Sequence, residues 1–368
     1  MNPEPSQKKR IVVALSGGVD SSVCAQLLVE QGHEVIGMTL KTWSNNECRD
    51  EKSKGCCSLR DIDDARSVAR KLNIPYYVMD LSSDFKEKVI DYFVDEYFRG
   101  RTPNPCIECN NHIKFGVLAQ KAKELGASYV ATGHYARKDF VASENRYCVK
   151  EGVDLSKDQT YVLFGLDQDQ LERILLPIGD LEKKEVRRLA EKMGLRVHDK
   201  PDSQEICFVK GKYGDFVKGY SPERLPGKGE ILDAKGTVLG EHEGSHLFTV
   251  GQKKRLRLDS APDYFVTAVK PETNQIVVGP EEDLMVSTMT VRQLNWQLNP
   301  KLGDVHVKIR SRHIKTPAEI ISLGNQAVVR FKYPQKAVTP GQAAVFYDAC
   351  PPDGGARVLG GGWIESAA

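Results

Sequence analysis

The strongest constraint on the fold is the order of elements within residues 11–28. The apolar run from Ile11 to Leu15 predicts a buried strand, and the apolar spacing from Val23 onward predicts a helix. Between them, Gly17 and Gly18 lack Cβ atoms, so the backbone can turn sharply and approach an anion closely. Three hydroxyl donors accompany this turn: Ser16, Ser21 and Ser22. This order predicts a phosphate-binding loop, in which a side chain at Gly17 would intrude on the phosphate.

The loop from Ser16 to Ser22 matches neither common phosphate motif. It lacks the Gly-Lys-Ser/Thr ending of a Walker A loop and the third glycine of a dinucleotide fingerprint. Its sequence, Ser-Gly-Gly-Val-Asp-Ser-Ser, resembles the PP-loop of ATP pyrophosphatases, which cleave ATP between the α and β phosphates and leave AMP on a substrate oxygen. Asp20 then becomes a candidate for organising the loop or its Mg²⁺. The alternative is a Gly-Gly turn rich in small polar residues.

The first half of the chain alternates between strand and helix patterns. Strands are predicted at 10–15, 34–40, 75–81 and 128–134, and helices at 19–31, 61–72, 84–98, 113–126 and 183–193. This alternation predicts an α/β fold with a doubly wound parallel sheet. The strand that ends in Gly133 and His134 places both residues at the carboxyl edge, where open α/β sheets bind ligands.

The second half of the chain changes to short strands separated by turn residues, and 183–193 is the last predicted helix. We therefore expect a PP-loop domain over 1–205, a small β-rich central domain over 206–283 and a C-terminal β-barrel over 284–368.

Composition sets limits on function. The 368 residues are 40% hydrophobic and 28% charged, with a net charge of +2, as in a soluble globular protein. We expect a cytoplasmic protein, because no stretch is apolar enough for a signal peptide or a membrane span. The net charge alone does not indicate nucleic acid, but Lys/Arg gather at 253–257 and 301–340. Either cluster is a nucleic-acid contact or only a solvated face.

The segment from Thr102 to Asn111 contains Pro103, Pro105, Cys106 and Cys109. The prolines predict a stiff loop that is neither helix nor central strand. Cys109 would begin the next helix, with Asn110 or Asn111 as N-cap and Lys114 nearby, which favours a nucleophilic thiolate. The alternative is half of a zinc site, although the chain has no second Cys-x₂-Cys.

The other cysteines carry weaker signals. Cys207 lies after a helix and a proline, between Lys200 and Lys210 in the sequence, and would by itself be a buried small hydrophobe. We expect the same of Cys24, Cys148 and Cys350. For Cys48, Cys56 and Cys57 a mobile lid, an accessory metal site and inert thiols all stay open.

Ordered motifs extend over nearly the whole chain: Leu15 to Ser22, Gly100 to Pro105, Cys109-Asn110, Ile113 to Phe115, Ala131 to Tyr135, Lys157 to Tyr161, Asp202 to Phe208 and Thr339 to Tyr347. Together they resemble the motifs of the tRNA-specific 2-thiouridylases. Cys106 departs from the pattern, since some members have aspartate there. Ser311 departs too, because a tyrosine after the arginine is common.

The resemblance implies roles for individual residues. Residues implied to bind ATP are Ala14, Leu15, Ser16, Gly17, Gly18, Val19, Asp20, Ser21, Met38 and Gly133. Residues implied to contact tRNA are Asn104, Pro105, Cys106, His134, Lys157, Asp158, Gln159, Arg310, Ser311 and Gln342. Cys109 would be the catalytic thiol, and Cys207 would carry the incoming sulfur as a persulfide.

The implied reaction places sulfur at position 2 of the wobble uridine of tRNA. ATP and Mg²⁺ would convert the C2 oxygen to an adenylate, and the base would be flipped out of its stack. Attack of Cys109 on the persulfide would release sulfide or leave a Cys109–Cys207 disulfide. We expect a monomer supplied by a persulfide donor protein.

Three alternatives remain. Cys106, Cys109 and Cys207 together could hold an iron–sulfur cluster with one open iron. A PP-loop ligase or amidotransferase would adenylate another substrate and use no cysteine pair. A metal- and RNA-binding protein without enzymatic activity would use Cys106 and Cys109 structurally.

Overall fold

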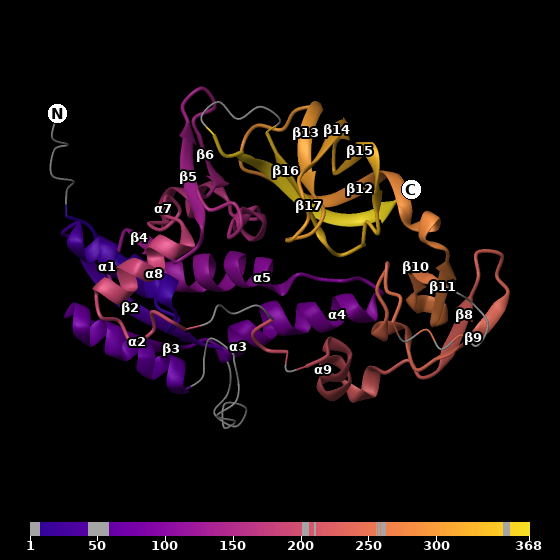
Figure 1. Ribbon diagram of the computed structural model, residues 1–368, viewed down its shortest axis with the longest axis horizontal. Coiled ribbons are helices and arrows are strands. Elements are labelled where there is room, and N and C mark those ends of the chain that lie inside the picture. Colours follow the sequence, from indigo (N-terminus) through magenta and orange to yellow (C-terminus); the bar gives the residue numbers. More distant parts are fainter. Residues whose placement is uncertain are drawn as a thin grey trace. The chain divides into compact units, whose positions relative to one another are not determined.

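The computed structural model describes residues 8–42, 59–200, 206–209, 211–254, 256, 258, 263–348 and 354–368. The chain forms two compact units (Figure 1). Unit 1 comprises residues 1–89, 106–208 and 351–358, and unit 2 comprises 90–105, 209–350 and 359–368. Predictions for Cys48, Cys56, Cys57, Asp202 to Glu205, Arg255, Arg257 and Cys350 lie outside the described residues. The domain boundaries after residues 205 and 283 stay a prediction.

Unit 1 contains a five-stranded sheet in which every neighbouring pair is parallel. Its order is β3-β2-β1-β4-β7. The strands are β1 Arg10–Ala14, β2 Glu34–Lys41, β3 Tyr76–Asp80, β4 Tyr129–Ala131 and β7 Ile174–Leu175. Strand β1 is central, because Val12 pairs with Ile36 on one side and Val130 on the other. The predicted α/β fold with a parallel sheet is confirmed.

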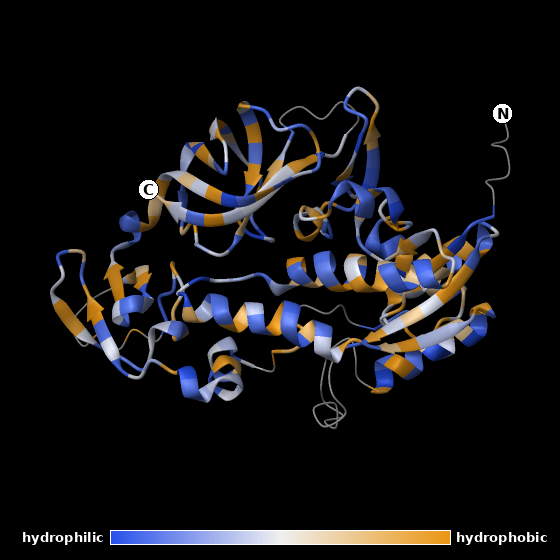
Figure 2. Ribbon diagram, turned by 180° about the vertical axis from the view of Figure 1, so that it is seen from behind, coloured by the Kyte–Doolittle hydropathy of each residue, from blue (hydrophilic) through white to orange (hydrophobic). Residues whose placement is uncertain are grey.

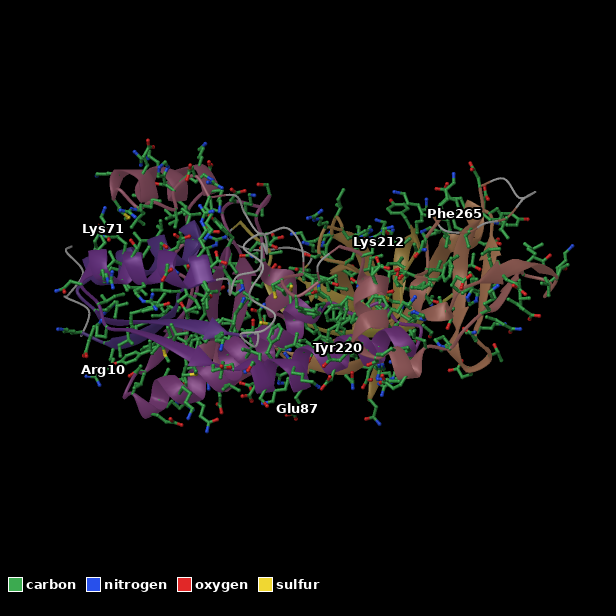
Figure 3. The ribbon with its side chains drawn as sticks, turned by 90° about the horizontal axis from the view of Figure 1, so that it is seen from below. Arg10, Lys71, Glu87, Lys212, Tyr220 and Phe265 are labelled. Carbon is green, nitrogen blue, oxygen red and sulfur yellow. The ribbon has the colours of Figure 1, made fainter. Side chains whose placement is uncertain are left out.

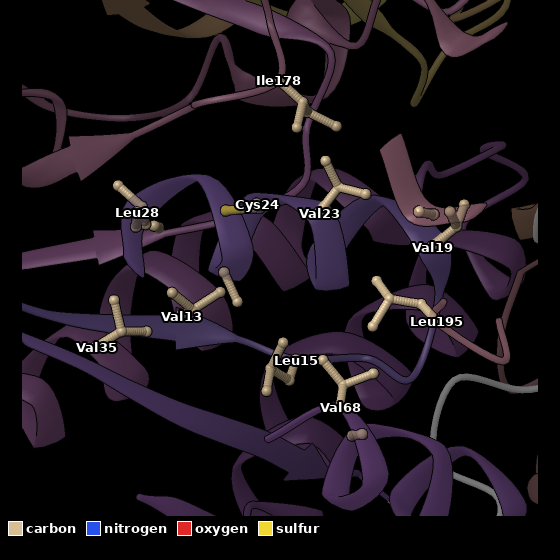
Figure 4. Close-up of a cluster of buried hydrophobic side chains, with 14 of the residues drawn as sticks. Val13, Leu15, Val19, Val23, Cys24, Leu28, Val35, Val68, Ile178 and Leu195 are labelled. Atoms are coloured by element: carbon tan, nitrogen blue, oxygen red, sulfur yellow. The ribbon is translucent and has the colours of Figure 1, made fainter. Parts of the chain in front are cut away.

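Helices α1 Val19–Glu30, α2 Leu59–Leu72 and α8 Lys183–Lys192 cover this sheet. Their apolar faces meet β1 in one core, in which Val13, Val23 and Leu28 pack together (Figure 4). Cys24 and Cys148 are fully buried, so their predicted role as small hydrophobes is confirmed. Burial raises the pKa of the Cys24 thiol, which keeps it protonated and inert.

Two helical runs of the first half differ from prediction. The run expected at 84–98 consists of α3 Ser82–Phe85, the π-helix η1 Lys86–Asp91 and α4 Tyr92–Phe98. The run expected at 113–126 already begins at Pro105, as α5 Pro105–Glu108, the π-helix η2 Cys109–Val117 and α6 Leu118–Glu124. The prediction of a non-helical loop through Asn111 is therefore wrong. Proline is tolerated in the first helical turn, where its missing N–H has no intrahelical partner.

A hairpin between β4 and β7 is absent from the sequence prediction. It consists of β5 Ala136–Val141 and β6 Arg146–Glu151. The helices that follow it are η3 Thr160–Leu163 and α7 Gln168–Arg173, and Asp167 caps α7 with a capping box.

The second segment of unit 2, which starts at residue 209, opens with a helix that sequence patterning missed. This helix, α9 Tyr213–Tyr220, contradicts the expectation that 183–193 is the last. Its aromatic face packs on α4, where Tyr213 stacks on Tyr97 at 4.6 Å between ring centroids. The hydroxyl of Tyr220, labelled in Figure 3, donates to Asp91 Oδ1 at 2.5 Å. Aromatic residues and two glycines in so short a segment hide the helical period.

The rest of unit 2 is β-rich, as predicted. A four-stranded sheet has the order β10-β11-β8-β9, with β8 Gly229–Leu232, β9 Val238–His242, β10 Phe265–Lys270 and β11 Gln275–Gly279. Four short helices accompany these strands: η4 Pro222–Arg224 precedes β8, η5 Ser245–Leu247 joins β9 to β10, η6 Pro271–Thr273 joins β10 to β11, and η7 Glu281–Leu284 follows β11.

The C-terminal strands close into a six-stranded barrel of order β12-β15-β14-β13-β16-β17. They are β12 Met285–Trp296, β13 Gly303–Lys308, β14 Thr316–Leu323, β15 Gln326–Lys336, β16 Ala343–Tyr347 and β17 Val358–Ala367. Hydrophobic and hydrophilic residues alternate along strands such as β13 and β15 (Figure 2), whose inward side chains fill the barrel, whereas every residue of β16 is buried. The predicted C-terminal β-barrel is confirmed. In the part of the chain that the structure describes, no helix is long and apolar enough to cross a membrane.

Candidate functional site

The glycine loop joins the end of β1 to the start of α1 at the carboxyl edge of the sheet. Gly17 has a φ of +70°, a left-handed conformation that favours glycine. Gly18 is the N-cap of α1 and provides no side-chain acceptor. Ser21 Oγ accepts from Ser16 N at 3.2 Å, and Ser22 Oγ donates to Gly18 O at 2.8 Å. The loop is thus held by its own hydroxyls, while the N-terminus of α1 carries the positive end of the helix dipole.

Met38 and Gly133 flank this loop on the two sides of β1. Met38 pairs with Ala14, and Met38 O accepts from Leu15 N at 2.8 Å. Gly133 directly follows β4, and a Cβ there would lie 2.7 Å from Ser21 N. The residues predicted to bind ATP, Ala14 to Ser21 with Met38 and Gly133, therefore gather at one edge.

The expectation that a side chain at Gly17 would first meet the phosphate is corrected by the structure. A Cβ at this position would lie 2.2 Å from Asp61 O and 2.9 Å from Asp61 C. The first obstacle to a side chain is thus the backbone of α2 rather than a phosphate, so Gly17 is needed for packing in the folded chain.

Asp20 is the centre of a partly buried cluster. Both of its carboxylate oxygens accept from Lys183 Nζ, at 2.7 and 2.8 Å, and Tyr135 OH donates to Oδ1 at 2.8 Å. The Lys183 side chain is only 10% exposed, and its backbone N donates to Asp154 Oδ2 at 3.0 Å. Helix α8 therefore begins directly against the first turn of α1, which supports the prediction that Asp20 organises the loop.

Lys200 forms a second contact to the loop. Its Nζ donates to Gly17 O at 2.9 Å, to Asp61 Oδ1 at 2.6 Å and to Asp64 Oδ2 at 2.8 Å. Burial lowers the pKa of Lys200, but its bonds to the two carboxylates outweigh burial and raise the pKa above its ordinary value. A charged Lys200 therefore fastens α2 to the loop.

Sequence reasoning missed Lys183, Tyr135, Asp61 and Asp64 as parts of this site, and treated Lys200 only as a cation near Cys207. Lys183 is 163 residues from Asp20 in the sequence, so no local pattern signals the pair. The only available sign was that Asp61 and Asp64 lie in the first turns of a predicted helix, where carboxylates are favoured.

Cys109 lies within a helix rather than at its start, because α5 begins at Pro105. The proposed N-cap role of Asn110 or Asn111 is wrong, since both lie inside η2; the buried Asn110 instead donates from Nδ2 to Val162 O at 2.9 Å. Cys106 is exposed, whereas Cys109 is half-buried. The position of Cys109 in the second turn removes the argument that a helix N-terminus lowers the pKa of its thiol.

Cys207 is half-buried, and its neighbour Phe208 is buried. The Phe208 ring meets Phe85 of α3 edge-on, with 5.8 Å between centroids. Helix α3 also packs against η2, the π-helix that begins with Cys109. Both segments that carry the predicted sulfur chemistry therefore contact the same short helix.

The predicted tRNA residues of unit 1 lie around β4 and the loop after β6. His134 is buried, and its Nδ1 is 2.7 Å from Thr132 Oγ1. Burial, and then the nearby Lys114, lower the pKa of His134 well below its ordinary value, so the ring is neutral. Gln159 Oε1 accepts from Tyr135 N at 2.9 Å, and Asp158 Oδ2 accepts from Thr160 Oγ1 at 2.7 Å. Lys157 lies in the same loop and is half-buried.

The remaining predicted tRNA residues lie in unit 2, apart from the exposed Cys106 of unit 1. Arg310 and Ser311 are exposed in the turn between β13 and β14. Asn104 is half-buried and Pro105 is buried. Gln342 is half-buried, and its Nε2 donates to Thr102 O at 2.6 Å.

Three families match consecutive parts of the chain. Residues 9–211 match the family described as tRNA methyl transferase HUP domain, 214–280 match tRNA methyl transferase PRC-barrel domain, and 286–364 match Aminomethyltransferase beta-barrel domain. Among solved structures, a 4-thiouridine synthetase–RNA complex with bound ATP has a TM-score of 0.34 and 16% identity, over 59% of this chain and 51% of that chain. That likeness is too small to support an inference.

Curated relatives match over the full length. The tRNA-specific 2-thiouridylase MnmA of Geobacter metallireducens is 48% identical over 98% of this chain and 98% of its own length. The proteins of the same name from Clostridioides difficile and Symbiobacterium thermophilum are 46% and 47% identical, each over 98% of this chain, covering 99% and 93% of their own lengths. With this identity over both chains, and with a glycine loop and a thiol helix in the same unit, the chain belongs to the tRNA-specific 2-thiouridylase family.

Proposed function

We propose that the protein is a tRNA-uridine 2-sulfurtransferase, which uses ATP to replace the C2 oxygen of the wobble uridine by sulfur. The observation that carries the proposal is the glycine loop at the carboxyl edge between Met38 and Gly133, in the same unit as Cys109 and Cys207. Membership of the 2-thiouridylase family supports the choice of tRNA and of sulfur.

The loop suits the adenylation step. The C2 oxygen of uracil is a poor leaving group, and transfer of AMP to it creates a good one. The backbone N–H groups at the start of α1 would bind ATP phosphates, and Lys183 and Lys200 would keep the loop in shape. Asp20 is bonded to Lys183 and Tyr135, so a Mg²⁺ at this edge fits best if phosphate oxygens supply most of its ligands. Mg²⁺ would spread the negative charge of the phosphates.

The thiols suit the sulfur step. A persulfide on Cys207, loaded by a donor protein, would supply the terminal sulfur. Cys109 would attack the inner sulfur, release hydrosulfide and form a Cys109–Cys207 disulfide, which an external thiol then reduces. Hydrosulfide would attack C2, and AMP would leave with the former carbonyl oxygen. The contact of α3 with both segments supports an approach of the two cysteines.

The description of the matching HUP family mentions a methyl transferase, whereas the full-length relatives are called thiouridylases. Two half-buried cysteines, both in segments that contact α3, favour sulfur transfer.

The test is thiolation of unmodified tRNA with ATP, Mg²⁺ and a persulfide donor, followed by mass spectrometry of the wobble uridine. Cys109→Ser and Cys207→Ser should each abolish thiolation, while the exposed Cys106→Ser, as matched control, should keep near wild-type activity. Proteins purified without oxygen are assayed together, with iron and acid-labile sulfide measured in each.

Each alternative has its own outcome. Iron-dependent activity lost in all three variants would establish the cluster route; among the described residues, no three His, Cys, Asp or Glu side chains gather closely enough to hold a metal. Full activity of Cys207→Ser would favour a PP-loop ligase or amidotransferase. Absence of tRNA-dependent pyrophosphate release would favour a protein that only binds RNA.

A further inference from the structure

The barrel holds a short backbone segment that precedes the thiol helix. This segment, Gly100–Thr102, belongs to unit 2, as does the barrel loop Thr339–Gln342. Thr102 N donates to Pro340 O at 2.9 Å, and Gln342 Nε2 donates to Thr102 O at 2.6 Å. Both backbone polar groups of Thr102 are therefore bonded to the same barrel loop.

The barrel loop Thr339–Gln342 lies so close to the segment Gly100–Thr102 that no side chain fits at Gly341. Gly341 has a φ of +87°, and a Cβ there would lie 2.7 Å from Arg101 Cβ and 2.8 Å from Thr102 N. The loop is itself fixed to β17, because Gly341 N donates to Ile364 O at 2.9 Å and Ile364 N donates to Gln342 O at 2.8 Å. The contact is thus made by two well-anchored pieces of backbone.

Ion pairs hold the same segment from another side. Arg101 Nη2 is 3.1 Å from Glu365 Oε1 of β17, and Glu365 Oε2 is 2.6 Å from Arg292 Nε of β12. Arg101 N donates to Glu96 O at 2.8 Å, and the Glu96 side chain is only 3% exposed. Thr102 Oγ1 is also 3.0 Å from Thr249 Oγ1. The end of α4 and the residues after it are therefore fixed to both β regions of unit 2.

From Thr102 the chain runs through a stiff connection into the thiol helix. Pro103 and Pro105 each have a restricted φ, and both are buried. Helix α5 begins at Pro105, and η2 continues it from Cys109. The chain passes from unit 2 to unit 1 between Pro105 and Cys106. A displacement of Thr102 is therefore passed along few rotatable bonds to the turns that carry Cys106 and Cys109.

We propose that Gln342 is a positioning residue for Cys109: its amide holds Thr102, so that the barrel sets where the thiol helix begins. This inference rests on the proposed function and makes the barrel a means by which bound tRNA influences the reactive thiol. It differs from the role implied by the family resemblance, in which Gln342 touches tRNA. A direct contact would contribute to tRNA affinity, whereas a positioning bond contributes to rate.

The experiment compares Gln342→Met with Gln335→Met. Methionine has nearly the volume of glutamine but no amide donor, so Thr102 O would lose this bond. Gln335 is a matched control, because its Nε2 also donates to backbone carbonyls of the barrel, Tyr333 O at 2.8 Å and Pro334 O at 3.2 Å, but not to Thr102. Three quantities are measured: the dissociation constant for tRNA, the single-turnover thiolation rate at saturating tRNA, and the alkylation rate of Cys109 against pH, followed by peptide mass spectrometry.

Gln342→Met should lower the thiolation rate by roughly tenfold and change the alkylation profile of Cys109, with tRNA affinity within about twofold of wild type. Gln335→Met should resemble wild type in all three. Weaker tRNA binding by Gln342→Met, with an unchanged rate at saturation and unchanged alkylation, would overturn the inference in favour of direct contact.

Two further measurements keep the test decisive. ATP affinity and the melting temperature report whether Gln342→Met is folded; if it is not, Gln342→Asn, which keeps the amide on a side chain shorter by one methylene, replaces it with the same expectations. Alkylation of Cys109 does not require the proposed reaction. A wild-type protein that thiolates no tRNA would therefore refute the function, while an altered alkylation profile in the variant would still support the positioning role.

Discussion

Charged residues are used differently around the glycine loop of unit 1 and in the β13–β14 turn of unit 2. Lys183 and Lys200 are both partly buried and bonded to carboxylates at 2.6 to 2.8 Å. Arg310 and Arg312 are exposed on the barrel surface. Charge near the loop therefore maintains the shape of a site, whereas charge on the turn is available for a partner. Substitutions in the first region should change the loop itself, and those in the second only binding.

The largest effect is expected from Lys183→Met, compared with its neighbour Lys184→Met. Loss of the Lys183 ammonium leaves the partly buried Asp20 without its cation, a change worth about 3 kcal/mol or roughly a hundredfold. ATP affinity and tRNA-dependent pyrophosphate release should fall accordingly. Lys184 is exposed and forms a surface ion pair with Glu182, so its variant should behave as wild type. Equal behaviour of the two variants would remove the distinction between the two regions.

The next largest effect is expected from Gly17→Ala in the glycine loop, compared with Gly32→Ala after the end of α1. Both glycines have positive φ, so each alanine introduces strain of about 1 kcal/mol. Only at Gly17 would the new Cβ meet backbone, whereas nothing lies within 4 Å of it at Gly32. Gly17→Ala should therefore lose about 2 kcal/mol more unfolding free energy than Gly32→Ala, as measured by chemical denaturation. Equal losses would show that α2 yields easily to the loop.

On the barrel, Arg310→Ala and Arg312→Ala should each weaken tRNA binding by several-fold. The slope of log K against log salt should become shallower by roughly 0.7 to 0.9 for each phosphate that the variant no longer neutralises. ATP affinity and melting temperature should not change. Arg330→Ala is the control, because Arg330 lies on the same barrel but its charge is paired within the protein: Arg330 Nη1 is 3.7 Å from Glu319 Oε2. Unchanged salt slopes in both variants would identify the turn as a solvated face.

The smallest effect is the contribution of His134 to the pH dependence of stability. Its pKa is lowered by burial and by Lys114, so the unfolded chain takes up the proton at higher pH than the folded one. This part of the stability is complete above the ordinary pKa of about 6.5 and declines as pH falls below it. Between pH 7.5 and 5.5, wild type should lose about 1 kcal/mol more unfolding free energy than His134→Asn. Parallel curves for the two proteins would contradict the assignment.

Sequence reasoning succeeded where structure follows from neighbouring residues. The apolar run before Gly17 and the helical spacing after it predicted β1, the loop and α1, and the alternating short runs predicted the barrel. Sequence reasoning failed at Pro105, because a proline can either break a helix or occupy its first turn. Pro105 was interpreted as excluding a helix, although it begins one. It also could not pair Lys183 with Asp20 or Lys200 with Asp61, because such contacts depend on how distant segments pack.

The division of the chain between the units has a consequence for biosynthesis. Unit 1 includes residues 351–358 and unit 2 includes residues 359–368, so each unit depends on segments made late. Domains generally fold in order as they leave the ribosome, the N-terminal one first. Here the sheet and glycine loop emerge early, whereas the β5–β6 hairpin lacks its contacts to Ala356 and Arg357, and the barrel has an open edge on β12 until β17 pairs with it. Nascent chains stalled before residue 351 should therefore expose unpaired strand edges to chaperones, even though the residues described at the nucleotide site have already been synthesised.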